Sequence, residues 1–338
     1  MMAVCFASLD RFHGCIASCR NAAENLGGTW AVIPSDGPTP PAALEADVLV
    51  LSSWCPRYEP LLAEYTGAIV PRWHSPVLQT ELCGEGEPLT RIVGLLDEGR
   101  VPAMAANDAA MAAVLDRPAV VHLPDLPPRL TAVVQPAQLQ GVNISLFGAA
   151  HARKNLLSQS AAFALAGRRF GFAGWTLHLN GQTTREASYA EWLALARIPY
   201  VDHGWLDRTA YLSLVAAMDV GLCATLSESY GYAAADHVEL GVPVVASPTV
   251  ACLGTYAPRV APENVTAIAA ALSDGVANRA SVTRAQQLAF EDQARTNLRV
   301  AQLALHDILA RVRAHRPDAW RAGGSRPRRF RELRLGAE

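Results

Sequence analysis

The chain has 338 residues and a mass of 36.1 kDa, a length that favours two domains. Half of its residues are apolar and 18% are charged, which excludes a disordered protein. The formal net charge of −2 argues against a generally basic nucleic-acid binder. No apolar run approaches the roughly 18 residues of a membrane span. The first residues lack the basic stretch of a signal peptide, so we expect a cytoplasmic protein.

Two residue types have unusual counts. The seven cysteines form no C-x-x-C pair, which favours free, buried thiols in a reducing compartment over disulfides or a zinc site. The chain also contains 28 arginines but a single lysine, Lys154. Arginine and lysine are not interchangeable at phosphates, so the one surviving lysine indicates a position where a compact ammonium is needed.

The first 125 residues alternate short apolar runs with amphipathic stretches. Helices are predicted at 16–26, 57–65, 89–98 and 108–115. Strands are predicted at 3–7, 29–34, 47–52, 68–71, 101–105 and 119–123. Continuous apolar strands separated by helices are typical of a parallel sheet that is covered on both faces. This half is therefore predicted to be a Rossmann-like, doubly wound unit.

A proline-rich segment, residues 124–141, interrupts this alternation, which then restarts. Strands are predicted at 143–147, 176–179, 200–201, 220–224 and 242–246. Helices are predicted at 154–165, 187–196, 208–217, 231–240, 264–273 and 281–314. We expect a first domain over 1–137, a second over 138–299, a helix at about 300–316 that packs on the first, and an Arg-rich tail at 317–338. Two such sheets would place a ligand site between their carboxyl edges.

One segment of the second half, residues 225–247, combines glycines, acids and a helix start. Glu228 lies in a loop after a predicted strand, and Tyr230-Gly231 opens a helix. Gly231 allows a ligand to approach the backbone, and the helix N-terminus offers free N–H groups to an anion. Asp236 follows Glu228 by eight residues, so both carboxylates can face one ligand that carries hydroxyls around a phosphate.

This segment resembles the retaining glycosyltransferases of the GT-B fold, specifically glycosyltransferase family 4. The family phrase has a glutamate, seven residues, a second glutamate, and then G-x-P-V-V. Here the first acid is Glu228, the second is Asp236 in place of glutamate, and Gly241-Val242-Pro243 follows in register. The resemblance implies two Rossmann-like domains that face each other across a cleft.

A second segment, residues 143–155, is similar to the family's strand-Gly-Arg-x4-Lys phrase. Gly148 and Lys154 stand at the glycine and lysine positions, whereas Ala149 replaces the family arginine and Arg153 lies beside the lysine. Residues 201–220 are similar to the phrase that precedes the first glutamate. The resemblance therefore covers residues 143–272, and the first domain matches by architecture only.

The resemblance implies a role for each matching residue. Glu228 would contact the donor sugar, and the backbone of Tyr230 and Gly231 would lie near the sugar or the diphosphate. Lys154, with the amide of Gly148, would neutralise the leaving diphosphate, and Asp236 would bind the ribose. Arg153 matches no motif position and would compensate for the arginine that is missing at Ala149. The nucleotide-sugar donor, with UDP favoured, is a substrate, and neither a cofactor nor a metal is expected because no D-x-D phrase is present. The reaction would be retaining.

The first domain offers weaker candidates. His74 follows a predicted strand and is proposed as a catalytic residue that contacts donor or acceptor, although a structural role is equally consistent. His13 lies in the first strand-to-helix loop, and His122 is expected to be structural. Asp10, Arg11 and Trp54 are candidates for the acceptor side.

Alternatives remain at this point. Taken alone, Glu228 and Asp236 are also typical of solvated acids, and Glu239 is expected to be a surface charge. The acceptor is open: a glycan, a lipid-linked sugar, a small molecule or a modified DNA base. Residues 311–334 carry nine arginines and two acids, which is most simply a solvated end of the chain and alternatively a patch suited to an anionic surface such as DNA. A degenerate nucleotide-sugar-binding protein is the second alternative. A dehydrogenase is disfavoured because no G-x-G-x-x-G follows the first strand.

Overall fold

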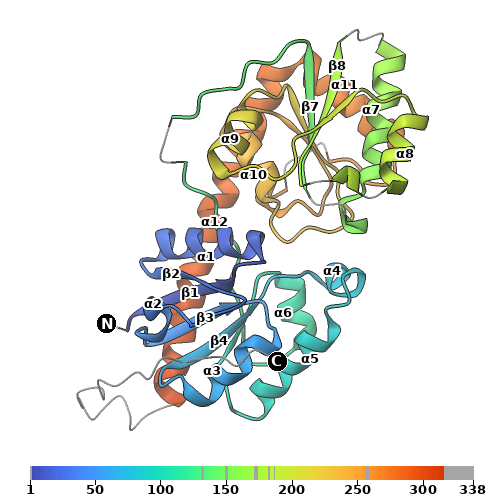
Figure 1. Cartoon of the computed structure of the whole chain (residues 1–338). Helices are drawn as coiled ribbons and strands as arrows, with labels where there is room; N and C mark the ends of the chain where they lie inside the picture. Colours follow the sequence, from blue (N-terminus) through green and yellow to red (C-terminus); the bar gives the residue numbers. More distant parts are fainter. Residues whose placement is uncertain are drawn as a thin grey trace. The chain divides into compact units, whose positions relative to one another are not determined.

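The structure is a computed structural model (Figure 1) that describes residues 2–130, 133–148, 151–170, 174–181, 183–185, 187–255 and 259–315. The chain divides into two compact units. Unit 1 comprises Met1–Leu126 and Thr296–Glu338, and unit 2 comprises Pro127–Arg295. The boundaries predicted from the sequence, 137 and 299, correspond to those at 126 and 295. The Arg-rich tail and Ala149 lie outside the described residues.

Unit 1 contains a six-stranded parallel sheet in the order β2-β1-β3-β4-β5-β6. Each of the six strands predicted for this half is present. Their bounds are β1 (Val4–Leu9), β2 (Thr29–Ile33), β3 (Val48–Ser52), β4 (Ala68–Trp73), β5 (Met104–Ala106) and β6 (Val120–His122). The chain reverses its direction of travel across the sheet between β1 and β3, which is where open α/β sheets bind ligands.

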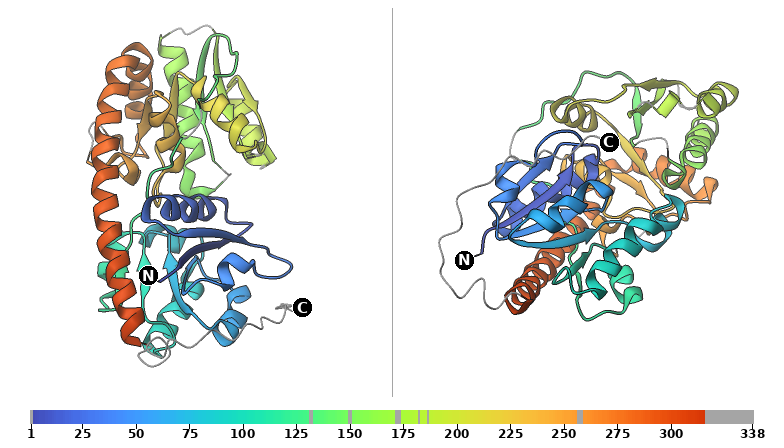
Figure 2. Two further views of the ribbon diagram at one scale, coloured as in Figure 1. Left: turned by 90° about the vertical axis from the view of Figure 1, so that its left-hand side faces the viewer. Right: turned by 60° about the horizontal axis from the view of Figure 1, so that its bottom comes forward.

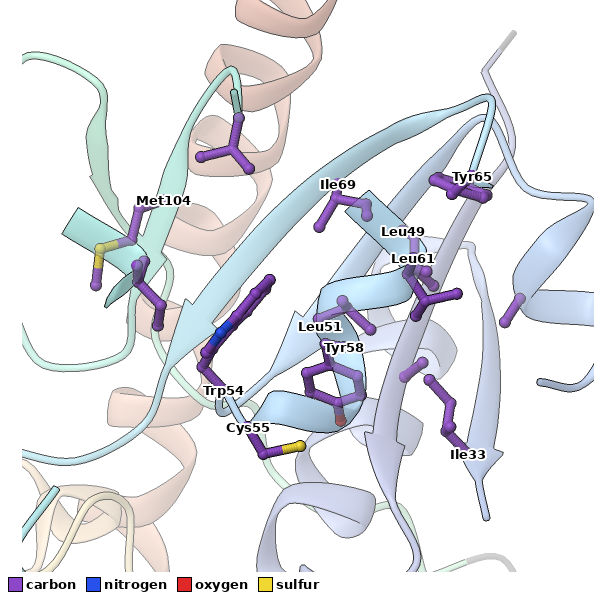
Figure 3. Packing of buried hydrophobic residues seen from close by; sticks show 14 of the residues in the cluster. Ile33, Leu49, Leu51, Trp54, Cys55, Tyr58, Leu61, Tyr65, Ile69 and Met104 are labelled. Carbon is purple, nitrogen blue, oxygen red and sulfur yellow. The ribbon is translucent and has the colours of Figure 1, made fainter. Parts of the chain in front are cut away.

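Both faces of this sheet are covered, as the continuous apolar strands predicted. Alternate residues of β1 point to opposite faces, with Leu9 in one cluster and Phe6 in the other. Figure 3 shows the first cluster, where Tyr58 and Leu61 pack over Leu49 and neighbouring strand residues. The helices of this part are α1 (His13–Leu26), α2 (Pro41–Leu44), α3 (Glu59–Glu64), α4 (Val77–Leu82), α5 (Gly86–Asp97) and α6 (Ala109–Leu115). Helices α2 and α4 were not predicted.

Unit 2 contains a five-stranded parallel sheet in the order β11-β10-β7-β8-β9. All five predicted strands are present. Their bounds are β7 (Val142–Leu146), β8 (Trp175–Leu179), β9 (Tyr200–Asp202), β10 (Val220–Cys223) and β11 (Val244–Ala246). The order is that of a doubly wound nucleotide-binding fold, with its switch point between β7 and β10. The loops that follow these two strands carry the motifs.

The helices of unit 2 are α7 (Leu156–Phe170), α8 (Ala187–Leu195), α9 (Arg208–Ala216), α10 (Tyr232–Glu239) and α11 (Val265–Ala277). Side chains cap two of them: Asp207 accepts from the amide of Ala210 at 2.9 Å, and Asn264 accepts from the amide of Ala267 at 3.0 Å. Such caps satisfy amides that a helix start leaves unpaired. The predicted helices are thus confirmed, with starts that shift by a few residues.

Helix α12 (Arg279–His315) is continuous in the left view of Figure 2 and contributes residues to both units. Phe290 packs in a core cluster of unit 2, whereas Ala301, Ile308 and Val312 pack beneath the sheet of unit 1. No described helix is long and apolar enough to cross a membrane. All seven cysteines are free thiols, but Cys15 and Cys83 are only partly buried, unlike the expectation for the set.

Candidate functional site

The loops after β7 and β10 enclose a narrow pocket at the switch point of unit 2. Its enclosed volume is about 10 Å³, and the rest of the space between the loops is open to solvent. Two predicted ligand-binding side chains, Lys154 and Glu228, line it together with the backbone of Gly231. The start of α10 forms another wall, so the positive end of its dipole borders the pocket. The remaining lining residues are Leu146, Phe147, Gln159, Leu222, Cys223, Thr225, Ala233, Ala234 and Val250.

Lys154 and Glu228 form an ion pair across this pocket. The Lys154 ammonium donates to Oε2 of Glu228, and the Arg153 guanidinium lies 3.3 Å from Oε1 of the same carboxylate. The side chains are only 15% and 11% exposed for Lys154 and Glu228. Burial by itself raises the pKa of Glu228, but Lys154 and Arg153 outweigh burial and hold that pKa below its ordinary value. Glu228 is therefore an ionised carboxylate and not a solvated loop acid.

Two amides that the sequence analysis did not single out hold the Lys154 loop. Asn155 adopts a left-handed backbone with φ of 55°, and its side-chain amide donates to the carbonyls of Ala224 and Pro262 at 3.0 and 2.5 Å. Gln159 donates to the carbonyl of Lys154 and accepts from the amide of Ala224, both at 2.7 Å. The two loops of the site are thus fastened to each other. The only sequence signal for this arrangement was an asparagine just before a helix, because asparagine adopts the left-handed backbone more readily than most residues.

Gly148 ends the other side of this loop with φ of +141°, a conformation that disfavours a side chain. A Cβ there would lie 3.3 Å from Cε of Lys154. The amide of Gly148 donates to Oδ1 of Asn180 at 2.8 Å. The predicted contact between this amide and a diphosphate would therefore require Asn180 to release it.

Gly231 precedes α10 with φ of +90°, and a Cβ at this position would lie 2.7 Å from a methyl group of Val250. Only glycine fits here without displacing backbone or neighbour. The side chain of Tyr230, in contrast, is buried and packs against the ring of Tyr232 at 4.8 Å. The Tyr230 phenol therefore belongs to the core, and its backbone carbonyl accepts from the amide of Cys252 at 2.9 Å. The predicted contact between the Tyr230 backbone and a ligand stays a prediction.

Asp236 lies on the buried side of α10 and does not line the pocket described above. Both of its carboxylate oxygens accept from the guanidinium of Arg208, each at 2.6 Å. The Asp236 side chain is 3% exposed, which excludes the exposed helix acid considered above. Sequence analysis missed Arg208, because nothing local links it to an acid 28 residues away.

The expectation that Glu239 is a surface charge was wrong. It is not a solvated surface charge: Oε1 accepts from the amide of Leu130 at 3.4 Å, and Oε2 is a buried atom without a hydrogen-bond partner among the described residues. Burial raises its pKa to about 7, and the neighbouring Asp236 carboxylate adds to this shift. Glu239 lies at the far end of α10 from Gly231 and acts as an anchor for the segment that enters unit 2.

In unit 1, His74 lies at the carboxyl end of β4 beside a buried charged network. The Arg72 guanidinium donates to Asp125 at 3.0 Å, and Nδ1 of His74 lies 3.8 Å from the same oxygen. Burial, followed by the Arg72 charge, lowers the pKa of His74, so its imidazole is neutral. Its Nε2 has no hydrogen-bond partner within the described part of the chain. A catalytic role for His74 stays a prediction.

The other candidates of unit 1 are dispersed. The Asp10 carboxylate accepts from the amide of Ser35 at 3.0 Å, and the Arg11 guanidinium lies 5.0 Å from the ring of Phe12. Trp54 differs from the expectation for an acceptor wall, because its indole is 4% exposed and belongs to the core cluster of Figure 3. His13 begins α1, and His122 ends β6 half-buried.

Among the described residues, no group of three or more His, Cys, Asp or Glu side chains is placed to hold a metal ion. The charge available to an anion in the unit 2 pocket is that of Lys154, Arg153 and the start of α10.

No protein-family model and no curated protein matches the chain. Solved structures do. The sucrose-phosphate synthase of Thermosynechococcus elongatus aligns over 93% of this chain and 100% of its own, with a TM-score of 0.65 and 13% identity. An α,α-trehalose-phosphate synthase (UDP-forming) from Burkholderia xenovorans in complex with glucose-6-phosphate covers 79% and 73%, with a TM-score of 0.56 and 13% identity. The E. coli trehalose-6-phosphate structure bound with UDP-2-fluoro glucose covers 77% and 72%, with a TM-score of 0.57 and 13% identity.

Identities this low show the fold alone. With the strand orders of the two sheets, these matches establish the predicted fold class: two Rossmann-like parallel-sheet domains of the kind found in GT-B glycosyltransferases.

Proposed function

We propose that the chain is a retaining glycosyltransferase that moves a sugar from a nucleotide-diphosphate sugar, with UDP favoured, to an acceptor hydroxyl. One observation carries the proposal. The only lysine of the chain and the first acid of the Glu-x7-Asp segment meet in one pocket, at the switch point of a nucleotide-binding sheet and beside a helix N-terminus. The register of both motifs with family 4 supports a relation to that family.

The chemistry requires that negative charge on the leaving diphosphate be stabilised. The bond between the sugar C1 and the phosphate oxygen breaks, a bond from C1 to the acceptor oxygen forms, and the acceptor proton passes to the leaving phosphate. The Lys154 ammonium supplies a positive charge and the amides at the start of α10 supply hydrogen-bond donors, and both are held in place for this negative charge. We assign this neutralisation to them and to no metal ion.

Donor binding would redistribute the two cations of the site. Lys154 would exchange Glu228 for the diphosphate, because two phosphate groups carry more charge than one carboxylate. Arg153, which already lies 3.3 Å from the other oxygen of Glu228, would keep that carboxylate ionised. Glu228 would then accept from sugar hydroxyls and stabilise positive charge that develops on C1.

A second candidate function is nucleotide-sugar binding without turnover, which the departures of Ala149 and Asp236 from the family motif favour. Binding of a ribose by Asp236 would have to displace Arg208, which donates to both carboxylate oxygens at 2.6 Å. Glycosylation of a DNA base rests on the tail beyond the described residues and stays a prediction.

A thermal-shift panel of UDP, GDP, ADP and CMP, followed by the corresponding UDP- and GDP-sugars, tests the proposal. A nucleotide at 100 times its Kd stabilises a protein by about 2.7 kcal/mol. The stabilising donor is then incubated with acceptors with and without EDTA, and the anomer of the product is read by NMR. Turnover with retention in EDTA is expected. Binding without turnover selects the second candidate, and no binding of any nucleotide contradicts both.

A further inference from the structure

A cavity at the amino edge of the unit 2 sheet encloses about 210 Å³. It lies between the end of α7, the start of β8 and the turn that joins α8 to β9. The pocket of Lys154 and Glu228 lies at the opposite, carboxyl edge and shares no lining residue with it. An apolar cavity of about 150 Å³ is large enough to bind benzene, so this one has room for a ring with a small substituent.

The inner wall of this cavity is apolar. Phe163 and Trp175 are 2% and 4% exposed, and their ring centroids lie 5.8 Å apart. Ile198 adds a buried aliphatic side chain from the turn before β9. Walls of this kind bind the apolar body of a small ligand.

A glycine within α7 leaves the cavity open. Gly167 lines the cavity, and a Cβ at this position would meet no atom within 4 Å. A larger side chain would therefore have room to extend from the helix. Because glycine destabilises a helix interior relative to alanine, folding alone would favour a side chain here. The glycine preserves the empty space at a cost to the helix.

An arginine occupies a position whose backbone favours glycine. Arg197 follows α8 with φ of 53°, and the amide of Ile198 donates to the carbonyl of Leu193 at 3.0 Å, which is a Schellman helix end. A side chain is strained at this left-handed position. Strain of this kind persists where the side chain has a use, so it points to a role for the Arg197 guanidinium.

Two guanidiniums border the cavity, and no aspartate or glutamate is among its described lining residues. Arg168 is positioned by a hydrogen bond from its Nη2 to the carbonyl of Ala196 at 3.0 Å. Arg197 is exposed, and its guanidinium forms no hydrogen bond or ion pair with the described residues. The cavity therefore presents positive charge next to an apolar wall, which favours an anion.

We infer that this cavity binds a small organic carboxylate with an apolar body of about the size of one ring. The ring would pack against Phe163 and Trp175. The carboxylate would accept two parallel hydrogen bonds from Arg197, whose planar fork matches its two oxygens. A phosphate is disfavoured, because its three acceptor oxygens need more donors than one free guanidinium supplies. The site does not depend on the proposed glycosyltransferase activity.

Calorimetric titration of the full chain at pH 7 with four probes tests this: benzoate, its neutral isostere benzamide, acetate and phenyl phosphate. We expect benzoate to bind at least tenfold more tightly than benzamide or acetate, and phenyl phosphate to bind no more tightly than benzoate. Arg197→Gly should weaken benzoate binding at least tenfold, with a thermal midpoint no lower than that of wild type. Arg284→Ala, at an exposed arginine of α12 in the same unit, should leave the affinity unchanged.

A second variant tests the place of binding. Gly167→Leu fills the cavity and should abolish benzoate binding without lowering the thermal midpoint, because leucine suits a helix better than glycine. Gly94→Leu, on α5, where a Cβ also meets nothing within 4 Å, should leave binding intact. If Gly167→Leu fails to fold, Arg197→Gly alone decides.

Equal affinity for benzoate and benzamide, or no saturable benzoate binding up to millimolar concentration, would overturn the inference. Tighter binding of phenyl phosphate than of benzoate would overturn the assignment of a carboxylate. Benzoate binding that survives in folded Gly167→Leu would place the ligand elsewhere. UDP affinity should be the same in Arg197→Gly as in wild type, and its loss would assign Arg197 to the proposed donor site instead.

Discussion

Replacing Lys154 with methionine removes the main partner of a buried carboxylate and should destabilise unit 2. Removal of one partner of a fully buried ion pair costs about 3–5 kcal/mol. Here the two side chains retain 15% and 11% exposure, and Arg153 remains 3.3 Å from Glu228. We therefore expect Lys154→Met to lower the free energy of unfolding by about 2 kcal/mol at pH 7, measured by urea denaturation.

The pH dependence of this loss identifies its cause. The folded-state pKa of Glu228 lies below its ordinary value of 4.5, so the stabilisation by Lys154 is fully present above that value. It disappears as the pH falls through the depressed folded-state pKa, because a protonated Glu228 needs no cation. The difference between wild type and Lys154→Met should shrink accordingly below pH 4.5.

Two control variants test this explanation of the stability loss. Arg91→Met breaks an ion pair with Glu59 whose side chains are 36% and 37% exposed, and exposed pairs contribute about 0–1 kcal/mol. Adding Glu228→Gln to Lys154→Met should recover part of the loss, because the buried carboxylate that lost its lysine is then removed. If Lys154→Met costs no more than Arg91→Met, or costs the same at pH 4 as at pH 7, the account of the buried pair is wrong.

Three further predictions concern other parts of unit 2. Arg208→Leu removes the two hydrogen bonds that Arg208 donates to the buried Asp236 carboxylate and should cost about 3 kcal/mol in urea denaturation, with Arg208→Lys recovering only part. Gly231→Ala, at φ of +90°, should cost about 2 kcal/mol and abolish nucleotide binding, whereas Gly14→Ala, where a Cβ meets nothing within 4 Å, should do neither. Burial lowers the pKa of His237 to about 4 from an unfolded value of 6.5, so the unfolded state binds the proton first. The free energy of unfolding should thus fall by up to about 3 kcal/mol between pH 6.5 and 4, and His237→Gln should flatten that slope.

The fold was predictable because short local runs of apolar residues mark its strands. β3, predicted at 47–52 and found at Val48–Ser52, begins with four consecutive apolar residues and is buried on both faces. Even the three-residue β9 was located from the alternation of elements. Helix α4 escaped prediction because six residues give no helical period, and its apolar side chains do not face a core.

The site was predictable to the extent that motif spacing determines it. The register of Lys154 and Glu228 placed both in one pocket, and glycine chemistry located the start of α10. The hydrogen-bond partners of the acids on α10 were not predictable. The capture of Asp236 by Arg208 depends on the path of α9 over α10, which no local pattern encodes. Glu239 was expected at the surface because its anchor, the amide of Leu130, lies 109 residues earlier in the chain.

The central claim is that unit 2 binds a nucleotide diphosphate through Lys154. Calorimetric titration of UDP into wild type, Lys154→Met and Arg91→Met tests it most directly. The account predicts saturable binding to wild type and Arg91→Met, and binding at least tenfold weaker to Lys154→Met, a loss of about 1.4 kcal/mol or more. Equal affinity of UDP for all three proteins, or no binding to any of them, would contradict it.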